Sequence, residues 1–531
     1  MKRNVLATLM FGLLCAVSAH ADALIEAAKD NNAAEAKRLI AAGANVNVME
    51  NTKTALMFAA ASNSVDVAKV LIAAGANVNV RTSGNMTALM YAAKNNAVDV
   101  ARILIEAKAN VNVTTSNYMT ALMYAAENNA VDVAKLLIAA KANVNARNND
   151  GWTALTTAER NNATDVAELL RTVKPQEYPA YLTVRNTVIE GCDKNKLPDN
   201  LVIPEGITKI GESAFKGCTY LESVVIPGSV TRIDNKAFEN CTSLTSVTIQ
   251  DGVVEIGSGT FQGCVSLENI ALPNSISEIE RKMFKGCTAL KSIVIPDSVT
   301  KIGDGAFTGC TAFENIKIPS SIKEIGGGAF YGCEALKSIV IPSSVAKIGR
   351  TDEEGAYYIG QEQGDGVGVF GGCKALENIT IQDGVESIGS FTFNSCTALK
   401  SIVIPNSVKE IGGGAFSGCE ALKSIVIPSS VTKIGIDTFK DCTSLESAVI
   451  QRGVETIGDG AFGGCTALKS VSVPRSVTGI RGGAFSGCPN LSVQYDGTKA
   501  QWEAIRKGSD LFDDFVGNFI VHCKDGDVAQ E

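Results

Sequence analysis

Twelve cysteines recur at one fixed spacing, and this regularity constrains the fold more than any other feature of the sequence. They form two runs of six, from Cys218 to Cys333 and from Cys373 to Cys488, and neighbours within each run stand 23 residues apart. A period of this length is typical of a solenoid, in which one short unit is stacked many times and contacts only its neighbours. A chain built in this way argues against an enzyme.

Each cysteine belongs to a unit in which four short motifs keep their places, one of them containing the cysteine itself. In the unit that begins at Val299, they are Ile302-Gly303, Ala306-Phe307, Gly309-Cys310 and Ile318-Pro319. Twelve such units begin at Ile207, Val230, Val253, Ile276, Val299, Ile322, Val345, Val385, Val408, Val431, Val454 and Val477. The pattern resembles the bacterial surface-antigen type of leucine-rich repeat, called BspA-like. The resemblance implies an α/β solenoid over residues 201–494, in which each unit contributes a strand and a short helix or loop.

One segment of each unit alternates as a half-buried strand does. In Ser292-Ile293-Val294-Ile295-Pro296, Ile293 and Ile295 are predicted to face the core, and Pro296 ends the strand. The outward positions then form a column of small and mildly apolar side chains on an exposed sheet. Candidate protein-binding residues in this column are Val294, Lys317, Val340, Val403 and Val426. Alternatively, valine and threonine occupy these positions only because they favour strands.

The cysteine ladder allows two interpretations. In an oxidising compartment neighbouring thiols could form disulfides, but a disulfide also needs suitably directed Cβ atoms. The position of each cysteine, three residues before an inward leucine or phenylalanine, favours small buried hydrophobes with free thiols. Cys192 and Cys523 lie outside the ladder and too far apart in a solenoid to pair. No Cys-x-x-Cys spacing occurs, so no metal site is predicted.

Residues 22–174 follow a different period, of 33 residues. The motif Thr54-Ala55-Leu56-Met57 returns with its threonine at Thr87, Thr120 and Thr153. Between these motifs lie amphipathic helical patterns. The region resembles the ankyrin repeat, with Ala and Met where Pro and His are usual, and the resemblance implies an N-terminal all-α stack that binds proteins through hairpin tips and the inner helix face. Candidate binding residues at the tips are Met86, Tyr118, Met119, Trp152, Arg81 and Arg147. Alternatively, these side chains only cover the neighbouring repeat.

The first 21 residues have the features of a cleaved export signal. Lys2 and Arg3 precede a mainly apolar run, and Ala19-His20-Ala21 is a small-x-small cleavage pattern. Lipidation at Cys15 is an alternative, although Leu14 is larger than the residue that usually precedes a lipidated cysteine. No later run is long and apolar enough to cross a membrane, so the mature chain is expected to lack a transmembrane segment.

Three further segments interrupt or end the repeats. Residues 175–200 are expected to link the two arrays, and an insertion at 350–368 replaces two residues of a unit. A loop that carries Tyr357 and Tyr358 is predicted to contact a partner, because insertions in repeats often emerge on a binding face. Residues 495–531 are expected to cap the solenoid, beginning with a helix N-capped by Thr498.

Composition narrows the function. Residues 175–531 carry 31 basic and 42 acidic side chains, which argues against nucleic acid. Only His522 remains after signal removal, so we predict no catalytic residues, no cofactor and no metal. We predict a non-catalytic protein–protein interaction protein of the cell envelope, exported to the surface or secreted, that serves in adhesion or host interaction with protein partners such as host extracellular proteins. The alternative is a periplasmic scaffold or inhibitor that binds an envelope protein. The sequence leaves the oligomeric state open.

Overall fold

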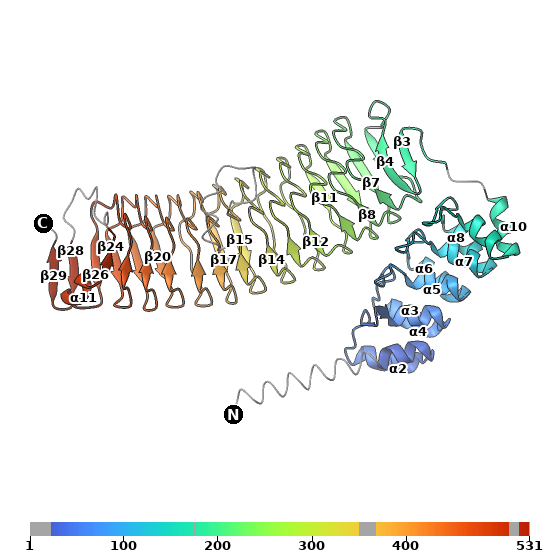
Figure 1. Cartoon of the computed structure of the whole chain (residues 1–531), viewed down its shortest axis with the longest axis horizontal. Helices are drawn as coiled ribbons and strands as arrows, with labels where there is room; N and C mark the ends of the chain where they lie inside the picture. The colour runs from blue at the N-terminus through green and yellow to red at the C-terminus, as the bar shows by residue number, and fades with distance from the viewer. Residues whose placement is uncertain (1–22, 174–176, 350–367, 509–519, 530–531) are drawn as a thin grey trace. The chain divides into compact units, whose positions relative to one another are not determined.

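A computed structural model describes residues 23–173, 177–349, 368–508 and 520–529. The chain folds into two compact units, one of which contains the helical N-terminal region and the other most of a β-solenoid. Figure 1 shows the paired helices in blue to cyan and the stacked strands in green to red. The predicted export signal and the insertion residues Tyr357 and Tyr358 lie outside the described residues.

The N-terminal region consists of helix pairs, as the 33-residue period predicts. Residues 23–29 are helical and are followed by α2 (Ala33–Ala41). A short hairpin of β1 (Met49–Glu50) and β2 (Lys53–Thr54) leads into the next repeat. The remaining helices are α3 (Ala55–Ala61), α4 (Val65–Ala73), α5 (Ala88–Lys94), α6 (Val98–Glu106), α7 (Ala121–Glu127), α8 (Val131–Ala139), α9 (Ala154–Arg160) and α10 (Thr164–Thr172).

Two sets of polar side chains order these repeats, one within each repeat and one between neighbouring repeats. The threonine of each motif caps the following helix, since its Oγ1 accepts a hydrogen bond from the backbone N–H three residues on, at 3.2–3.4 Å. The asparagines of the Asn-Val-Asn motifs link neighbouring repeats: Asn47 Oδ1 accepts from the N–H of Asn77, and Asn79 Oδ1 from that of Asn110, both at 2.8 Å. Repeats that lack the usual histidine are therefore joined by asparagine side chains as well as by packing.

The second region is a solenoid with two series of parallel strands, one of longer and one of shorter strands. The long strands, of three or four residues each, are β5 (Asn200–Val202), β7 (Ser223–Ile226), β9 (Ser246–Ile249), β11 (Asn269–Ala271), β15 (Ser338–Ile341), β17 (Asn378–Ile381), β20 (Ser424–Ile427), β22 (Ser447–Ile450), β24 (Ser470–Val473) and β26 (Ser492–Tyr495). The short strands, of two residues each, are β6 (Lys209–Ile210), β8 (Arg232–Ile233), β10 (Glu255–Ile256), β12 (Glu278–Ile279), β13 (Lys301–Ile302), β14 (Glu324–Ile325), β16 (Lys347–Ile348), β18 (Ser387–Ile388), β19 (Glu410–Ile411), β21 (Lys433–Ile434), β23 (Thr456–Ile457), β25 (Gly479–Ile480) and β27 (Arg506–Lys507).

This architecture confirms the predicted solenoid and adds to it. The short second strand was not predicted, and turns rather than helices join the strands of the described units. Ten short strands, from β12 to β27, form one continuous sheet, whereas the ten long strands form separate sheets of four, two and four, the last of which is enlarged to six by two strands of the C-terminal end. The long strands, whose outward positions the sequence places on an exposed sheet, are therefore divided among three sheets. The segment that begins at Ser292 is no strand and makes a single bridge to Asn315.

Proline explains where the long strands pair. All four residues pair only where the next unit has Gln250, Gln382, Gln451 or Asp496 in place of the usual proline. The N–H at that position donates to the last carbonyl of the preceding strand, as Gln382 does to Ile341 at 3.1 Å. Proline has no N–H to donate. The pairing is accordingly shorter before Pro273 and Pro474, and it is a single bridge before Pro319 and Pro405.

The core of the solenoid is a stack of identical side chains. Twelve phenylalanines, from Phe215 to Phe485, stack face to face with ring centroids 5.1–5.7 Å apart. Beside them, each described ladder thiol from Cys241 onward donates to the carbonyl of a phenylalanine in the preceding unit, for example Cys310 Sγ to Phe284 O at 3.1 Å. All twelve ladder cysteines are free and buried, which confirms the interpretation as buried thiols.

The stack continues across the insertion. The Phe330 and Phe370 rings are 5.3 Å apart, and Cys373 Sγ donates to Phe330 O at 3.2 Å. Strand β16 pairs with β18, and β15 with β17, in the usual register. The insertion therefore leaves the solenoid itself unchanged.

Antiparallel hairpins close both ends. At the start β3 (Leu182–Arg185) pairs with β4 (Val188–Cys192), and at the end β28 (Ile520–Cys523) pairs with β29 (Gly526–Ala529). Between β26 and β27 lies α11 (Lys499–Glu503), whose N-cap is Thr498, as predicted; Thr498 and Gln501 form a capping box. The buried Trp502 packs edge-on against Tyr495. Phe512, Phe515 and Phe519 belong to residues 495–531, which are expected to cap the solenoid, and they lie outside the described residues.

Candidate protein-binding surfaces

The outward positions of the long strands carry most of the exposed apolar surface of the solenoid. Among the described residues, half of the twelve exposed large apolar side chains occupy the same position in their unit. We call this set the valine column: Val202, Val294, Val340, Val403, Val426 and Val449. Val294 and Val403 are 82% and 80% exposed, more than any other large apolar side chain described. Exposed apolar side chains that line up in this way are typical of interaction surfaces.

The structure places the predicted residues of the strand face on this column. Val340 lies on β15 opposite Thr380, and Val426 lies on β20 opposite Val449. Lys317 is exposed at the same position of its unit, next to that of Val294. Val294, Lys317 and Val403 all fall in units without a named long strand. Their role in binding remains a prediction.

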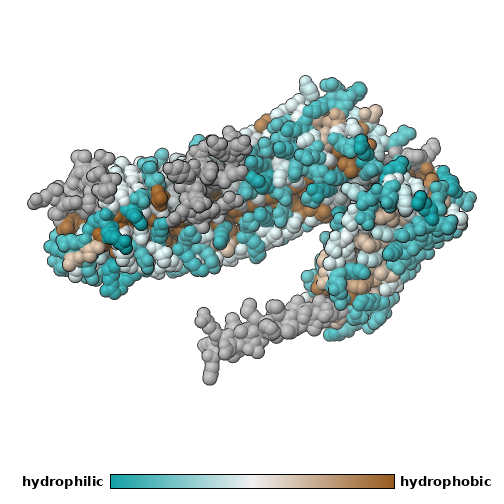
Figure 2. Space-filling view, viewed as in Figure 1, coloured by the Kyte–Doolittle hydropathy of each residue, from teal (hydrophilic) through white to brown (hydrophobic). Residues whose placement is uncertain are grey.

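Charged side chains beside the column pair with each other. Lys400 lies 2.9 Å from Glu377, and Lys469 lies 3.0 Å from Glu446, each pair joining two neighbouring units. Such exposed ion pairs contribute little to stability, but they neutralise the flank of the column. Figure 2 shows brown, apolar side chains among the teal and white ones of the solenoid. At these two places a partner would therefore meet apolar side chains beside paired charges.

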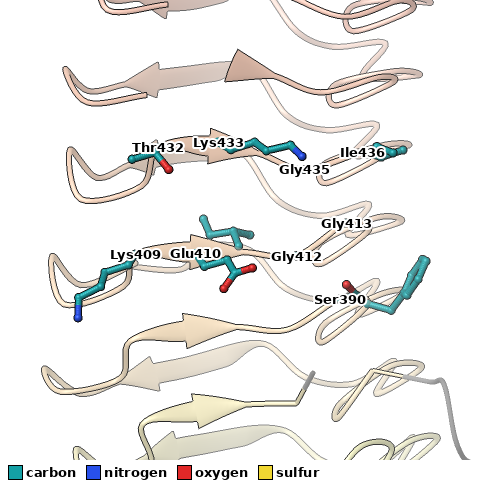
Figure 3. A pocket seen from close by; sticks show the side chains of 11 residues that line it. Ser390, Lys409, Glu410, Gly412, Gly413, Thr432, Lys433, Gly435 and Ile436 are labelled. Carbon is teal, nitrogen blue, oxygen red and sulfur yellow. The ribbon is translucent and has the colours of Figure 1, made fainter. Parts of the chain in front are cut away.

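A hollow of about 390 Å³ lies among the turns that follow β18, β19 and β21. Phe391 and the half-exposed Ile436 give it apolar walls, and Lys409, Glu410 and Lys433 supply charged groups. In Figure 3 the Glu410 side chain extends towards the Ser390 turn, and Ile436 lies at the tip of its own turn. The hollow has room for one apolar side chain of a partner.

Phe391 was missed in the sequence, although its position carries a signal. It has a φ of +56°, a left-handed conformation that a bulky side chain adopts only with strain. The equivalent position in other units holds Ser213, Lys236, Gly259, Lys282, Gly305, Gly328, Gly414, Asp437, Gly460 or Gly483. A column-by-column comparison of the units would have singled out this aromatic residue.

The tip residues predicted in the ankyrin region differ in exposure. Tyr118 is 49% exposed, whereas Met86 and Met119 are partly buried against the helical core. Trp152 is partly buried beneath the Arg160 guanidinium, whose carbon lies 4.0 Å from the centroid of the Trp152 ring system. The two predicted arginines also differ: Arg81 is partly buried, and the exposed Arg147 donates a hydrogen bond to the carbonyl of Gly151 at 2.7 Å. Their role in binding likewise remains a prediction.

An aromatic row on the first helix of successive repeats was not predicted. Phe58, Tyr91 and Tyr124 stand 33 residues apart on α3, α5 and α7, and each is partly buried. Lys53, in the hairpin before α3, lies 5.6 Å from the Phe58 ring centroid and 5.0 Å from that of Tyr91. The row therefore lies on the hairpin side of the helices. The 33-residue spacing of the aromatics was a signal for it.

The cysteine ladder offers no reactive site. Burial raises the pKa of Cys310, Cys373 and Cys419 to about 12, so these thiols stay protonated at neutral pH. Among the described residues, no three His, Cys, Asp or Glu side chains gather as metal ligands. In the same part of the chain, no helix has the length and apolar character needed to cross a membrane.

Comparison with known proteins identifies both repeat regions. The BspA type leucine rich repeat region matches residues 190–310, 277–352 and 366–492, which together exceed half of the chain. Ankyrin repeats match residues 8–82, 24–115 and 89–178. A crystal structure of a leucine rich cell surface protein from Faecalibacterium prausnitzii A2-165 is 31% identical, with a TM-score of 0.42, and the match covers 63% of this chain and 98% of that one. No curated protein matches the chain.

Proposed function

Because the chain belongs to the BspA-type leucine rich repeat family and carries ankyrin repeats before that region, we propose that it is an exported protein of the cell surface that binds other proteins in adhesion or host interaction. Repeats of both kinds imply protein–protein interaction and are generally non-catalytic scaffolds. The proposal extends this general role to a location and a purpose.

The valine column is the observation that supports the proposal most. Six apolar side chains at one position of the unit are exposed where a structural solenoid needs none of them. Strand propensity accounts for valine at a strand position, but Val294 and Val403 lie outside the named strands and are the most exposed. A partner that covered the column would bury them, which favours association.

The N-terminal pattern supports export. The positive start at Lys2 and Arg3, the apolar run and the Ala19-His20-Ala21 site have the order of a secretory signal. An exported chain with a large apolar column facing solvent suits a partner outside the cell better than an internal structural role.

Protease treatment of intact cells of the native source tests the location. Each repeat array would be followed by blotting, with lysed cells as the control for cleavability. We expect both arrays to be lost from intact cells. Protection until lysis would contradict a surface location and favour the alternative, a periplasmic scaffold or inhibitor.

A further inference from the structure

The aromatic row of the ankyrin stack stops at the last described repeat. The residue 33 positions after Tyr124 is Thr157, on α9. A cavity of about 460 Å³ lies beside it, and its lining includes Met119, Glu127, Asp150, Trp152 and Thr157. A small side chain thus stands where the preceding repeats place a ring.

Thr157 leaves one polar atom without a partner at this cavity. The residue is 3% exposed, and its Oγ1 is buried with no hydrogen-bond partner among the described residues. A buried hydroxyl without a hydrogen bond costs free energy, so its presence beside a cavity indicates a missing polar group.

The lining has an acidic character. Glu127 and Asp150 are both exposed, and neither forms an ion pair with any described residue. The lining includes no lysine or arginine, and its remaining polar members are four asparagines and Thr157. Among the residues that the structure describes, the only cation in contact with a lining ring is Arg160, which covers one face of Trp152.

We infer that this cavity receives an arginine side chain of a protein partner, which makes the last ankyrin repeat a specificity pocket of the proposed binding surface. A guanidinium is planar and carries five N–H donors, which suits two carboxylates, a buried hydroxyl and apolar walls. Arg160 on Trp152 is an example of such stacking within the same repeat. The inference rests on the proposed function, since it names the chemistry of the partner.

Synthetic glycine–serine peptides with one central residue test the pocket on the full chain. The central residue would be Arg, Lys, Tyr, Glu or citrulline, the neutral isostere of arginine, and tryptophan fluorescence would report binding near Trp152. We expect the arginine peptide to bind at least about tenfold more tightly than the citrulline peptide, because charge-assisted hydrogen bonds are lost in the latter. Equal binding of these two peptides, tighter binding of the tyrosine peptide or no saturation by the arginine peptide would overturn the inference.

Thr157→Tyr provides the sharpest variant. Tyr91 and Tyr124 already occupy the equivalent position in the two preceding repeats. The fold should therefore tolerate a tyrosine here, while its ring fills the cavity. Because the variant also retains both tryptophans, comparing it with the parent removes any contribution of Trp502 to the fluorescence change. We expect the arginine peptide to lose at least about tenfold in affinity; unchanged affinity would overturn the inference.

The paired change Glu127→Gln and Asp150→Asn removes the charge but keeps the shape. We expect it to abolish the preference for arginine over citrulline, whereas the matched change Asp99→Asn and Glu106→Gln on α6 should leave that preference intact. A preference that survives the first pair, or is lost with the second, would count against the pocket. Cleavage in intact cells does not depend on Thr157, so a failed pocket test would leave the proposed location standing.

Discussion

At the scale of single residues, the ladder cysteines serve the core and not chemistry. From Cys241 onward, each thiol lies beside the phenylalanine stack and donates to a phenylalanine carbonyl in the preceding unit, as Cys419 does to Phe393 at 3.2 Å. Burial penalises the thiolate, which is the nucleophilic form. The buried thiols can therefore persist without exchange even in an oxidising compartment.

Alkylation measures this protection directly. We expect iodoacetamide at about pH 8 to modify Cys192 and Cys523, which are partly exposed, and to leave the buried ladder unmodified until denaturant is added. Mass spectrometry of peptides from native and denatured protein would show the difference. Rapid native modification of Cys310, whose pKa burial raises to about 12, would contradict the packing described.

The sequence predicted buried positions well and surface positions only in part. Ile293 and Ile295 were predicted to face inward and are 6% and 5% exposed, because alternation fixes which face a residue takes. The cavity at Thr157 and the hollow at Phe391 were not predicted. Each depends on one unit departing from its neighbours, a difference that a repeat pattern hides.

At the scale of elements, identical segments have different structures. Ser-Ile-Val-Ile-Pro occurs at 292–296, 338–342, 401–405 and 424–428, yet only the second and fourth copies contain strands, β15 and β20. Both are followed by a unit with Gln382 or Gln451, which supplies an N–H that proline lacks. The strands could not be predicted from the segment alone, because the next unit decides the pairing.

Exchanging proline and glutamine tests this rule. We expect Pro319→Gln to add a hydrogen bond to Ile295 and to slow amide exchange at 315–319. The stability should change little, since about 1 kcal/mol from the bond offsets the added freedom of the unfolded chain. Gln382→Pro is the reciprocal control and should speed exchange at 378–381. The same exchange rates in both variants and the parent would contradict the rule.

The C-terminal cap contains a pH-sensitive contact. Asp496 lies 2.7 Å from Lys524 and 2.7 Å from Arg452, and hydrogen bonds from Lys524 and then Arg452 lower the pKa of Asp496 to about 2. A carboxylate with a lowered pKa stabilises the fold above its unfolded pKa of about 3.9, and this contribution is lost as the pH falls towards about 2.

We therefore expect the cap to loosen in acid through Asp496. The fluorescence of Trp502 would be followed from about pH 5 to about pH 2 in the parent and in Asp496→Asn. The parent should be the more stable protein at the upper end, and the difference should vanish at the lower end. If the difference in stability between the two proteins stayed constant over this pH range, the Asp496 carboxylate would have no role in the acid response of the cap.

At the scale of the whole molecule, periodicity made both arrays predictable. Each motif is repeated, so a substitution such as alanine for the ankyrin proline does not obscure the 33-residue pattern. Periodicity also implied the valine column before its exposure was known. It could not predict the short second strands, because two residues such as Lys301-Ile302 are too few to show an alternation.

Binding by the valine column is the central claim, and binding of a labelled chain of residues 22–531 to intact host cells tests it most directly. The variant with Val294, Val340, Val403 and Val426 all changed to Lys would be compared with the parent. Its matched control changes Ser277, Thr300, Ala346 and Thr478 to Lys, which adds the same charge at exposed positions before the short strands. Thermal unfolding would verify that both variants remain folded. We predict that the column variant loses at least about tenfold in affinity for the cells, while the control keeps the affinity of the parent. Equal affinity of the two variants would contradict a binding role of the valine column.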